Sequence, residues 1–456
     1  MSMGNSIEDF EILLLEKYRE MASRRDYISE ELYQKYDVQR GLRDKEGRGV
    51  LVGLTEIGEI QSYIVKEAET IPIPGKLIYR GVEISDIVEG FMSEGRFGYE
   101  ETCYLLLFGY LPNKVELEEF EHYISKRRCL PEEFARDVIM KLPSTDIMNV
   151  LSQSVLALYG YYENPDDTSI KNVLKQCIGL IACFPLLTVY GYQVYTYYHK
   201  QNSLLLRNPK PEYRTAENIL YMLRPDGIFT RFEAELLDLA LVLHAEHGGG
   251  NNSAFVTHAL TSTGTDTYST IVGALSSLKG PKHGGANIKV VQMFEDIKTN
   301  IKNWEDEEEI EDYLKKVLNK EAFDGSGIIY GMGHAVYTIS DPRNVIFKKQ
   351  VEVLAKEKGL EAEFNLYAKV EEIAPLVITR GKNRYKAICA NVDFYAGFLY
   401  RMLGIPPELF TPLFANARIV GWSAHRIEEL VNGPKIIRPA YKCVAPEKKY
   451  IGLEQR

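Results

Sequence analysis

The chain has 456 residues, of which 45% are hydrophobic and 26% are charged, a balance typical of soluble globular proteins rather than disordered ones. Its length exceeds what one small hydrophobic core needs and indicates more than one domain. The formal net charge of -10 argues against a duplex nucleic-acid partner, which requires a basic face. An anionic substrate is compatible with this charge, because a site can be locally basic on an acidic protein.

The N-terminal segment has the pattern of an amphipathic helix. Its apolar stripe consists of Phe10, Leu13, Leu14, Tyr18 and Met21, at the spacing of one helix face. The segment has neither the basic start of a signal peptide nor the arginine-rich composition of a transit peptide. The six cysteines form no CxxC pair, which favours buried or free thiols in a reducing compartment. These features predict a cytoplasmic protein.

Helical periodicity dominates the remainder of the chain. Short hairpin strands are expected within residues 51–65 and 76–84, and helices at 101–111, 216–223, 232–244 and 408–430. The acidic run at 305–312 is expected to be the first turn of a helix, where negative charge suits the helix dipole. The predicted fold class is therefore mainly α-helical.

Residues 177–198 imitate a membrane span. They carry no charge, and a helix of this length would cross a bilayer. Pro185, Thr188, Gln193 and several tyrosines lie within the run, and no second run of this kind follows it. A helix at the centre of a large helical core explains the run better, so we expect no membrane partner.

The apolar helical run at 232–244 ends with a histidine, and a second histidine follows shortly after it. His244 and His247 are three residues apart, and three glycines follow His247. One interpretation is a metal site completed by Glu246 or His283, but the spacing is not that of an HExxH motif and no cysteine joins it. In the other, His244 satisfies helix carbonyls and His247 contacts a ligand. We expect no metal.

The stretch KGPKHGGAN (279–287) places His283 among glycines, ahead of apolar residues at helical spacing. Pro281 suits the first turn of a helix, where the positive end of the dipole would disfavour an imidazolium ion. A neutral imidazole can donate one N–H to an enolate oxygen without being a strong acid. Gly284 and Gly285 would let a ligand approach the backbone. The alternative is a histidine that only caps its own helix.

The stretch GMGHAVYTISDPR (331–343) joins a glycine loop, His334 and Arg343. The Asp-Pro turn could aim Arg343 inward, and arginine recognises a carboxylate through two parallel hydrogen bonds. Further on, Asp393 begins a helical pattern that Gly404 ends. Its carboxylate is either an ordinary first-turn charge or, if partly desolvated, a general base.

Two more arginines lie towards the C-terminus. Arg418 falls on the same predicted helix face as Phe414 and Gly421, so it needs either an anionic ligand or a salt-bridge partner. Arg438 lies in KIIRPAYK (435–442).

Together these stretches resemble the citrate synthase family. The motifs follow the family's order from about residue 50 to 445: KLIYRG, YEETCYLLLFGYLP, ENILYML, HAEHGGGNNSAF, GPKHGGAN, GMGHAVY, DPR, NVDFYAG and RPAYK. The resemblance implies a dimer whose subunits each have a large helical domain and a smaller inserted helical domain that closes over a cleft. It assigns residues 1–45 to an N-terminal extension, 46–285 and 393–456 to the large domain, and 286–392 to the small closing domain.

The resemblance also implies a reaction, in which acetyl-CoA condenses with oxaloacetate through an enol or enolate and citryl-CoA is hydrolysed to citrate and CoA. His283 would hydrogen-bond the acetyl carbonyl, Asp393 would take the methyl proton, and His334 would polarise the oxaloacetate carbonyl. The oxaloacetate carboxylates would be held by His247, Arg343, Arg418 and, from the neighbouring subunit of a homodimer, Arg438. No cofactor is implied, because acetyl-CoA is a substrate.

The CoA contacts depart from the family pattern. Thr338 stands where many relatives have a basic residue for a CoA phosphate, and Ala390 replaces a proline often found before NVD. The expected CoA-binding residues are Gly331, Met332, Gly333, Lys382 and Arg384.

Two alternatives stay open at this point. One is 2-methylcitrate synthase, which takes propionyl-CoA, because one methylene is worth only about 1 to 3 kcal/mol of discrimination. The other is a non-catalytic relative that binds acyl-CoA or carboxylates as a regulator. The retention of both Asp393 and His283, together with the arginines, argues against the second.

Overall fold

The computed structural model describes residues 4–44, 49–66, 69–334, 336–382, 388–433 and 435–456. The chain divides into two compact units, Met1–Gly53 and Leu54–Arg456. The first unit contains α1 (Gly4–Arg25), α2 (Glu30–Lys35) and the short helix η1 (Arg40–Leu42). The predicted apolar stripe lies on α1, and Phe10, Leu13, Tyr18 and Met21 are exposed there.

The second unit carries the remaining elements, and helices dominate it. The strands are β1 (Gly58–Lys66), β2 (Glu69–Tyr79) and β3 (Val82–Glu83). The α-helices are α3 (Ile84–Ser93), α4 (Tyr99–Phe108), α5 (Lys114–Arg127), α6 (Ile147–Leu158), α7 (Ile170–Lys200), α8 (Thr215–Leu223), α9 (Arg231–His244), α10 (Asn252–Thr261), α11 (Thr267–Lys279), α12 (Ala286–Asn300), α13 (Glu307–Leu318), α14 (Pro342–Lys358), α15 (Glu361–Lys382), α16 (Asp393–Met402) and α17 (Phe410–Val431). Short helical turns are η2 (Ala135–Ile139), η3 (Tyr159–Tyr161), η4 (Pro407–Leu409) and η5 (Leu453–Gln455). The prediction of a mainly α-helical fold is confirmed.

The strands form one antiparallel sheet in the order β1-β2-β3, as the hairpin prediction required. The loop before α14 packs closely against β2. The N–H of Gly75 donates to the Ser340 carbonyl at 3.1 Å, and a Cβ on Gly75 would lie 2.2 Å from that oxygen. The Tyr337 hydroxyl donates to the carbonyl of Lys76 at 3.3 Å. The hairpin therefore supports the loop that carries His334.

The long apolar helix α7 lies in the core, because 83% of its most apolar window is buried. It packs against α5, α6, α8 and α17, and this explains why the run is apolar on every face. The core also contains a buried carboxylate with a clear task. Asp238 of α9 accepts the N–H groups of Gly98 at 2.6 Å and Tyr99 at 3.2 Å. It thereby satisfies the free N–H groups that begin α4.

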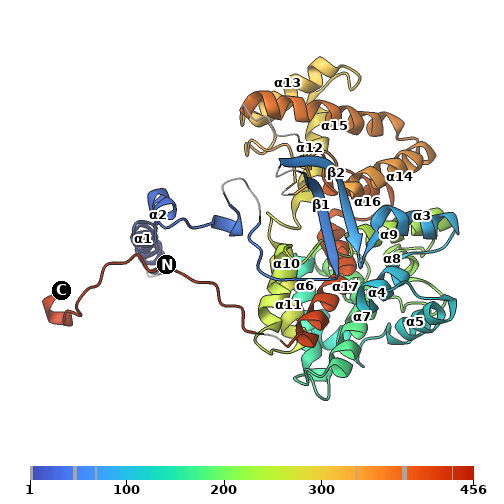
Figure 1. Cartoon of the computed structure of the whole chain (residues 1–456), viewed down its shortest axis with the longest axis horizontal. Helices are drawn as coiled ribbons and strands as arrows, with labels where there is room; N and C mark the ends of the chain where they lie inside the picture. The colour runs from blue at the N-terminus through green and yellow to red at the C-terminus, as the bar shows by residue number, and fades with distance from the viewer. Residues whose placement is uncertain (1–3, 45–48, 67–68, 335, 383–387, 434) are drawn as a thin grey trace. The chain divides into compact units, whose positions relative to one another are not determined.

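A second group of helices packs mainly among itself. α12 lies against α16, α13 against α15, and α14 against both α15 and α16. Figure 1 shows α12, α13 and α15 at the upper end of the second unit, away from α4, α7 and α11. The acidic run begins α13, where Asp306 accepts the N–H of Glu308 at 3.0 Å, as expected. The division into 46–285 with 393–456 and 286–392 stays a prediction.

Candidate active site

His283 lies in the turn between α11 and α12. Because α12 begins only at Ala286, Pro281 precedes the helix, and the prediction that it opens the first turn is wrong. The turn is closed by the backbone, since the N–H of His283 donates to the carbonyl of Gly280 at 2.8 Å. The imidazole is thus held by a tight turn and not by the helix.

Gly284 and Gly285, which follow His283, allow other protein atoms to pack closely against the turn. A Cβ on Gly284 would lie 2.5 Å from the carbonyl oxygen of Leu278 and 3.0 Å from the Thr411 side chain. One on Gly285 would lie 3.1 Å from the Cα of Pro281. The expectation that these glycines leave room for a ligand is therefore wrong, because protein atoms occupy that space.

His283 is nevertheless neutral, as predicted. Burial lowers its pKa to about 4, and the nearby positive charge of Arg418 acts in the same direction. Its Nε2 lies 3.2 Å from the Ser253 hydroxyl, which also accepts the indole N–H of Trp422 at 3.0 Å. The cause of neutrality is burial beside a cation, not the helix dipole.

Asn391 joins the two loops that carry His334 and Asp393. Its N–H donates to the carbonyl of Gly331 at 2.9 Å, and its side-chain amide donates to that of Gly333 at 2.9 Å. Its side-chain oxygen accepts the N–H of Asp393 at 3.0 Å. One amide side chain thus fixes the position of the carboxylate relative to the histidine.

The glycine loop has a backbone that only glycine adopts easily. Gly331 and Gly333 have φ of 79° and 88°, in the left-handed region. A Cβ on Gly331 would also lie 2.9 Å from the Phe394 ring, and Met332 pairs with Ala390 in an isolated antiparallel bridge. These contacts hold the loop against the start of α16.

The backbone determines which nitrogen of His334 carries a proton. Its Nδ1 accepts the N–H groups of Val336 at 3.0 Å and Tyr337 at 3.1 Å. A nitrogen that accepts hydrogen bonds carries no proton, so the proton of the neutral ring is on Nε2. His334 therefore presents an N–H donor on its other side.

Asp393 is the first residue of α16 and is half-buried. Burial raises the pKa of its carboxyl to about 6; the charges of Arg343 and Arg418 oppose this rise and that of Asp341 adds to it. A carboxylate with such a pKa is a stronger base than a solvated one and is still ionised at neutral pH. The desolvation that a general base requires is present.

Arg343 has a protein partner that sequence analysis missed. Asp341 caps α14, and its two carboxylate oxygens accept from Nε and Nη2 of Arg343 at 3.0 and 2.7 Å. Both side chains are almost fully buried. Two of the five guanidinium N–H donors are thus occupied, and three are left for other acceptors.

Arg418 is the most unusual charge in the molecule. Its side chain is 1% exposed, and its Nε–H donates to the carbonyl of His244 at 2.7 Å. Among the described residues neither Nη1 nor Nη2 has a hydrogen-bond partner, and burial lowers the pKa of the guanidinium to about 10. Because an unpaired buried charge is costly, this arrangement favours an anion-binding role over that of a salt-bridged core arginine.

His244 satisfies a helix carbonyl, as one of the two interpretations predicted. His244 Nδ1 donates to the carbonyl of Ala240 at 2.7 Å. His247 is buried, its Nε2 has no hydrogen-bond partner in the described part of the chain, and burial lowers its pKa well below the usual value. The Tyr79 hydroxyl donates to the backbone carbonyl of Glu246 at 3.0 Å, which fixes the chain just before His247.

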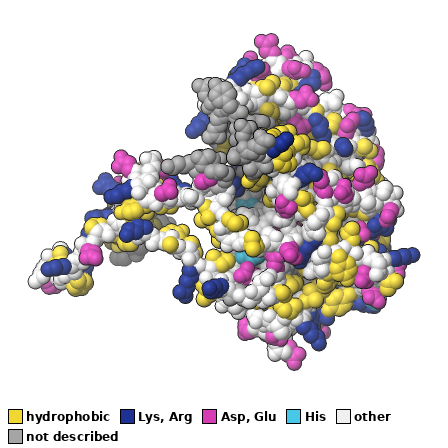
Figure 2. Space-filling model, in the orientation of Figure 1, with side chains coloured by type: hydrophobic (Ala, Val, Ile, Leu, Met, Phe, Trp, Pro, Cys, Tyr) yellow, Lys and Arg dark blue, Asp and Glu magenta, His cyan; other side chains and the backbone are white. Residues whose placement is uncertain are grey.

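Six of the predicted residues come together. His247 lies within electrostatic reach of Arg343, His334, Arg418 and His283, and the rings of His247 and His334 are 5.1 Å apart. Asp393 lies within electrostatic reach of Arg343 and Arg418. In the face that Figure 2 shows, small areas of histidine surface are visible near the middle of the molecule.

This arrangement combines one base of raised pKa, neutral imidazole donors and buried guanidinium groups. It is suited to removing a proton next to a carbonyl group while a dicarboxylate is bound close by.

Three predicted residues are not placed with this group. Arg438 is exposed in the segment after α17, and the neighbouring Ile437 N–H donates to the Ser262 hydroxyl at 3.1 Å. Lys382 ends α15, and Arg384 falls outside the described residues.

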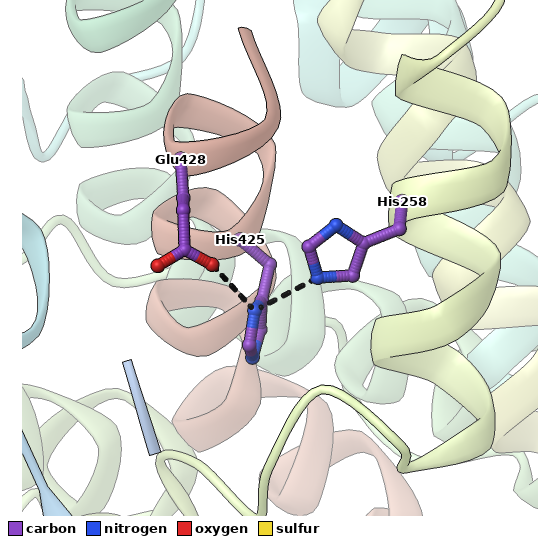
Figure 3. Close-up of side chains that lie close together, drawn as sticks. All are labelled: His258, His425 and Glu428. Carbon is purple, nitrogen blue, oxygen red and sulfur yellow. Dashed lines mark hydrogen bonds and ion pairs between the residues drawn. The ribbon is translucent and has the colours of Figure 1, made fainter. Parts of the chain in front are cut away.

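Sequence analysis also missed a second group of polar side chains. His258, His425 and Glu428 present one potential metal ligand each, all within 4.8 Å of one another, as Figure 3 shows. Their positions in the sequence give no signal, since 167 residues separate the two histidines. The i, i+3 spacing of His425 and Glu428 on one helix was the only available hint.

Comparison with known proteins identifies consistent relatives. A family model described as "Citrate synthase, C-terminal domain" matches residues 42–440. The citrate synthase of Synechocystis sp. is 35% identical, over 84% of this chain and 88% of that protein. The 2-methylcitrate synthase of Shewanella oneidensis is 29% identical, over 83% of this chain and 92% of that protein.

A solved structure agrees with these sequence relatives. The citrate synthase of Thermoplasma acidophilum, solved as a ternary complex with carboxymethyl coenzyme A and oxaloacetate, has a TM-score of 0.74 and 27% identity, covering 89% of this chain and 97% of that chain.

Proposed function

The chain belongs to the citrate synthase family of enzymes, its function is that of a citrate synthase, and we propose that the six-residue site condenses acetyl-CoA with oxaloacetate and then hydrolyses citryl-CoA to citrate and CoA. The observation that carries this proposal is the buried Arg418, whose two unpaired amino groups lie within electrostatic reach of both Asp393 and His283. An anion bound there would be next to the base and the donor.

Oxaloacetate binds first to the cationic part of the site in this proposal. One carboxylate pairs with the free Nη1 and Nη2 of Arg418, and the other meets the donors of Arg343 that Asp341 leaves available. His247 completes the set through its unpartnered Nε2. The Nε2–H of His334 donates to the ketone oxygen and polarises the carbonyl carbon for attack.

Proton removal from acetyl-CoA then falls to Asp393 and His283. The methyl proton of a thioester is feebly acidic, so the carboxylate needs a donor at the carbonyl oxygen where negative charge develops. The imidazole can donate from Nδ1 if its Nε2 accepts the Ser253 hydroxyl proton. Trp422 supports this orientation, because an indole N–H can only donate and so directs a lone pair of Ser253 towards itself.

The enolate carbon attacks the polarised carbonyl of oxaloacetate, the new carbon–carbon bond forms, and His334 stabilises the resulting alkoxide. Water then hydrolyses the thioester of citryl-CoA. Closure of residues 286–392 over the rest of the fold would exclude water until the condensation is complete.

The assembly and setting are further parts of the proposal. The protein would act as a homodimer in the cytoplasm without a cofactor, and Arg438 would reach the site of the neighbouring subunit. The exposed position of Arg438 supports this assignment, because such a side chain is available to a partner. CoA would be held by Gly331, Met332 and Gly333, together with Lys382 and Arg384.

Thiol release tests the proposal directly. We expect free CoA to form from acetyl-CoA only when oxaloacetate is present, and more slowly from propionyl-CoA, by about 10- to 200-fold in kcat/KM for one methylene. A higher kcat/KM for propionyl-CoA would instead assign 2-methylcitrate synthase activity, as in the Shewanella relative. No thiol release with either thioester would leave a non-catalytic binding protein and overturn the proposal.

The pH dependence follows from the pKa of Asp393, raised to about 6 by burial. The ionised carboxylate is the active form, so kcat/KM should be maximal well above pH 6 and should fall tenfold per pH unit well below it. His283, with its pKa near 4, stays neutral through this range. Measured profiles of thiol release should show one acidic limb near pH 6, and a limb below pH 5 would contradict the assigned base.

A further inference from the structure

A buried hydrogen-bonded chain leads away from the active site towards the surface. It starts at Glu246, next to His247, and its first contact is the 3.0 Å hydrogen bond between His425 Nε2 and Glu246 Oε1. The His425 Nδ1 then lies 3.1 Å from His258 Nε2, and His258 Nδ1 lies 2.8 Å from Glu429 Oε2. Figure 3 shows the two imidazoles facing each other, with Glu428 beside them.

The donors and acceptors in these hydrogen bonds require a positive charge between His425 Nδ1 and His258 Nε2. The space between these two nitrogens is called the gap below. A carboxylate only accepts, so His425 Nε2 and His258 Nδ1 must both carry protons. In two neutral rings the facing nitrogens, His425 Nδ1 and His258 Nε2, would then both present lone pairs at 3.1 Å. That contact is repulsive unless either one additional proton or a metal ion lies between them.

A third potential ligand lies at this gap. Glu428 Oε2 is 3.9 Å from His425 Nδ1 and accepts no hydrogen bond from any residue that the structure describes. Its other oxygen is held by the N–H of Glu56 at 2.8 Å, so the side chain is already oriented. Zinc prefers imidazole nitrogens and carboxylate oxygens as ligands. The gap offers two converging imidazole lone pairs and one buried carboxylate oxygen.

We propose that His258 Nε2, His425 Nδ1 and Glu428 Oε2 bind a divalent transition-metal ion such as Zn²⁺, with water as the fourth ligand. Ligand atoms about 2.0 Å from a tetrahedral ion lie roughly 3.3 Å from one another, close to the separation of the two nitrogens. Only a small rotation of Glu428 is needed to bring its oxygen to the same ion. Binding forms two N–metal bonds and one O–metal bond and releases the shared imidazole proton to solvent.

The surroundings of the gap suit a bound cation. Glu246 and Glu429 accept from the outer nitrogens of the two histidines, the arrangement that orients histidine ligands in zinc sites. Together with Glu428 they supply three carboxylates, which outnumber the two guanidinium groups that oppose a cation, Arg80 near Glu428 and Arg418 near Glu246.

The site has access to solvent and joins two helices. The side chains of His258 and Glu429 are 13% and 21% exposed, whereas His425 is fully buried. An ion would connect α10, which carries His258, to α17, which carries His425 and Glu428. The inference does not depend on the proposed reaction, and its test needs no substrate.

The test uses tag-free full-length protein that has been stripped with a chelator. Titration with Co²⁺, a spectroscopic substitute for Zn²⁺, should give the visible absorption bands of a tetrahedral ion, saturating at one equivalent per chain and abolished by added Zn²⁺. About one proton should be released per ion bound at pH 7 in weakly buffered solution. The midpoint of thermal unfolding should rise with free Zn²⁺ concentration.

His258→Gln and Glu428→Gln should each lower the affinity at least about tenfold. His199→Gln is the matched control, because His199 is exposed at the end of α7, and it should bind Co²⁺ like the unchanged protein. Either of two results would overturn the site. The first is that the His258→Gln variant keeps the tetrahedral absorption bands of Co²⁺. The second is that the unchanged protein binds Co²⁺ only weakly and the His199→Gln substitution removes that binding. Absence of saturable binding would mean that a proton alone fills the gap.

Discussion

Replacing Asp393 with asparagine is expected to lower kcat by about 10²- to 10⁴-fold, the usual contribution of a positioned general base. The amide has the same shape as the carboxylate but cannot accept the methyl proton. Oxaloacetate binding, measured by calorimetry, should be retained, because Arg343 and Arg418 are unchanged. Exchange of the acetyl methyl protons with solvent deuterium, followed by NMR, should fall with turnover.

The matched control is Asp306→Asn. Asp306 also lies at the start of a helix, where it caps α13 through the N–H of Glu308, and asparagine caps about as well as aspartate. This variant should turn over normally. Unchanged turnover in Asp393→Asn, with the acidic limb near pH 6 still present, would show that another group takes the proton.

The sequence predicted the helices well, because helical periodicity follows local rules, and it named candidate site residues that the fold brings together. Helical periodicity placed α9 and α17, and the apolar run of α7 was correctly assigned to the core. The motifs identified His283, Asp393 and Arg418 because each motif is short and contiguous. The neutrality of His283 was also predicted, although for the wrong reason.

What sequence could not predict depends on residues distant in the chain. Asp238 caps α4 from 140 residues away, and Ser253 meets Trp422 from 169 residues away. The turn at His283 was mistaken for a helix because Pro281 favours both structures. The gap between His258 and His425 arises from packing of α10 against α17, for which no local pattern exists.

Arg418→Leu is expected to separate binding from stability. The substitution removes the two unpaired amino groups and should weaken oxaloacetate binding by about 2 to 5 kcal/mol, the cost of deleting one partner of a buried charge pair. This corresponds to a Kd about 30- to 4,000-fold higher. In the absence of oxaloacetate, the free energy of unfolding should be unchanged or raised, since burying the guanidinium is costly and its Nη1 and Nη2 make no hydrogen bond among the described residues. Calorimetry and urea denaturation measure the two effects.

Arg426→Leu provides the contrast on the same helix. Arg426 is fully buried like Arg418, but its donors are satisfied by Thr261, Thr267, Thr270 and the carbonyl of Thr265. Its loss leaves those buried oxygen acceptors without a donor and should lower the free energy of unfolding by about 1 to 3 kcal/mol. The folded variant should still bind oxaloacetate normally. If Arg418→Leu lowered stability as much and left oxaloacetate affinity intact, Arg418 would be a structural arginine and the carboxylate site would lie elsewhere.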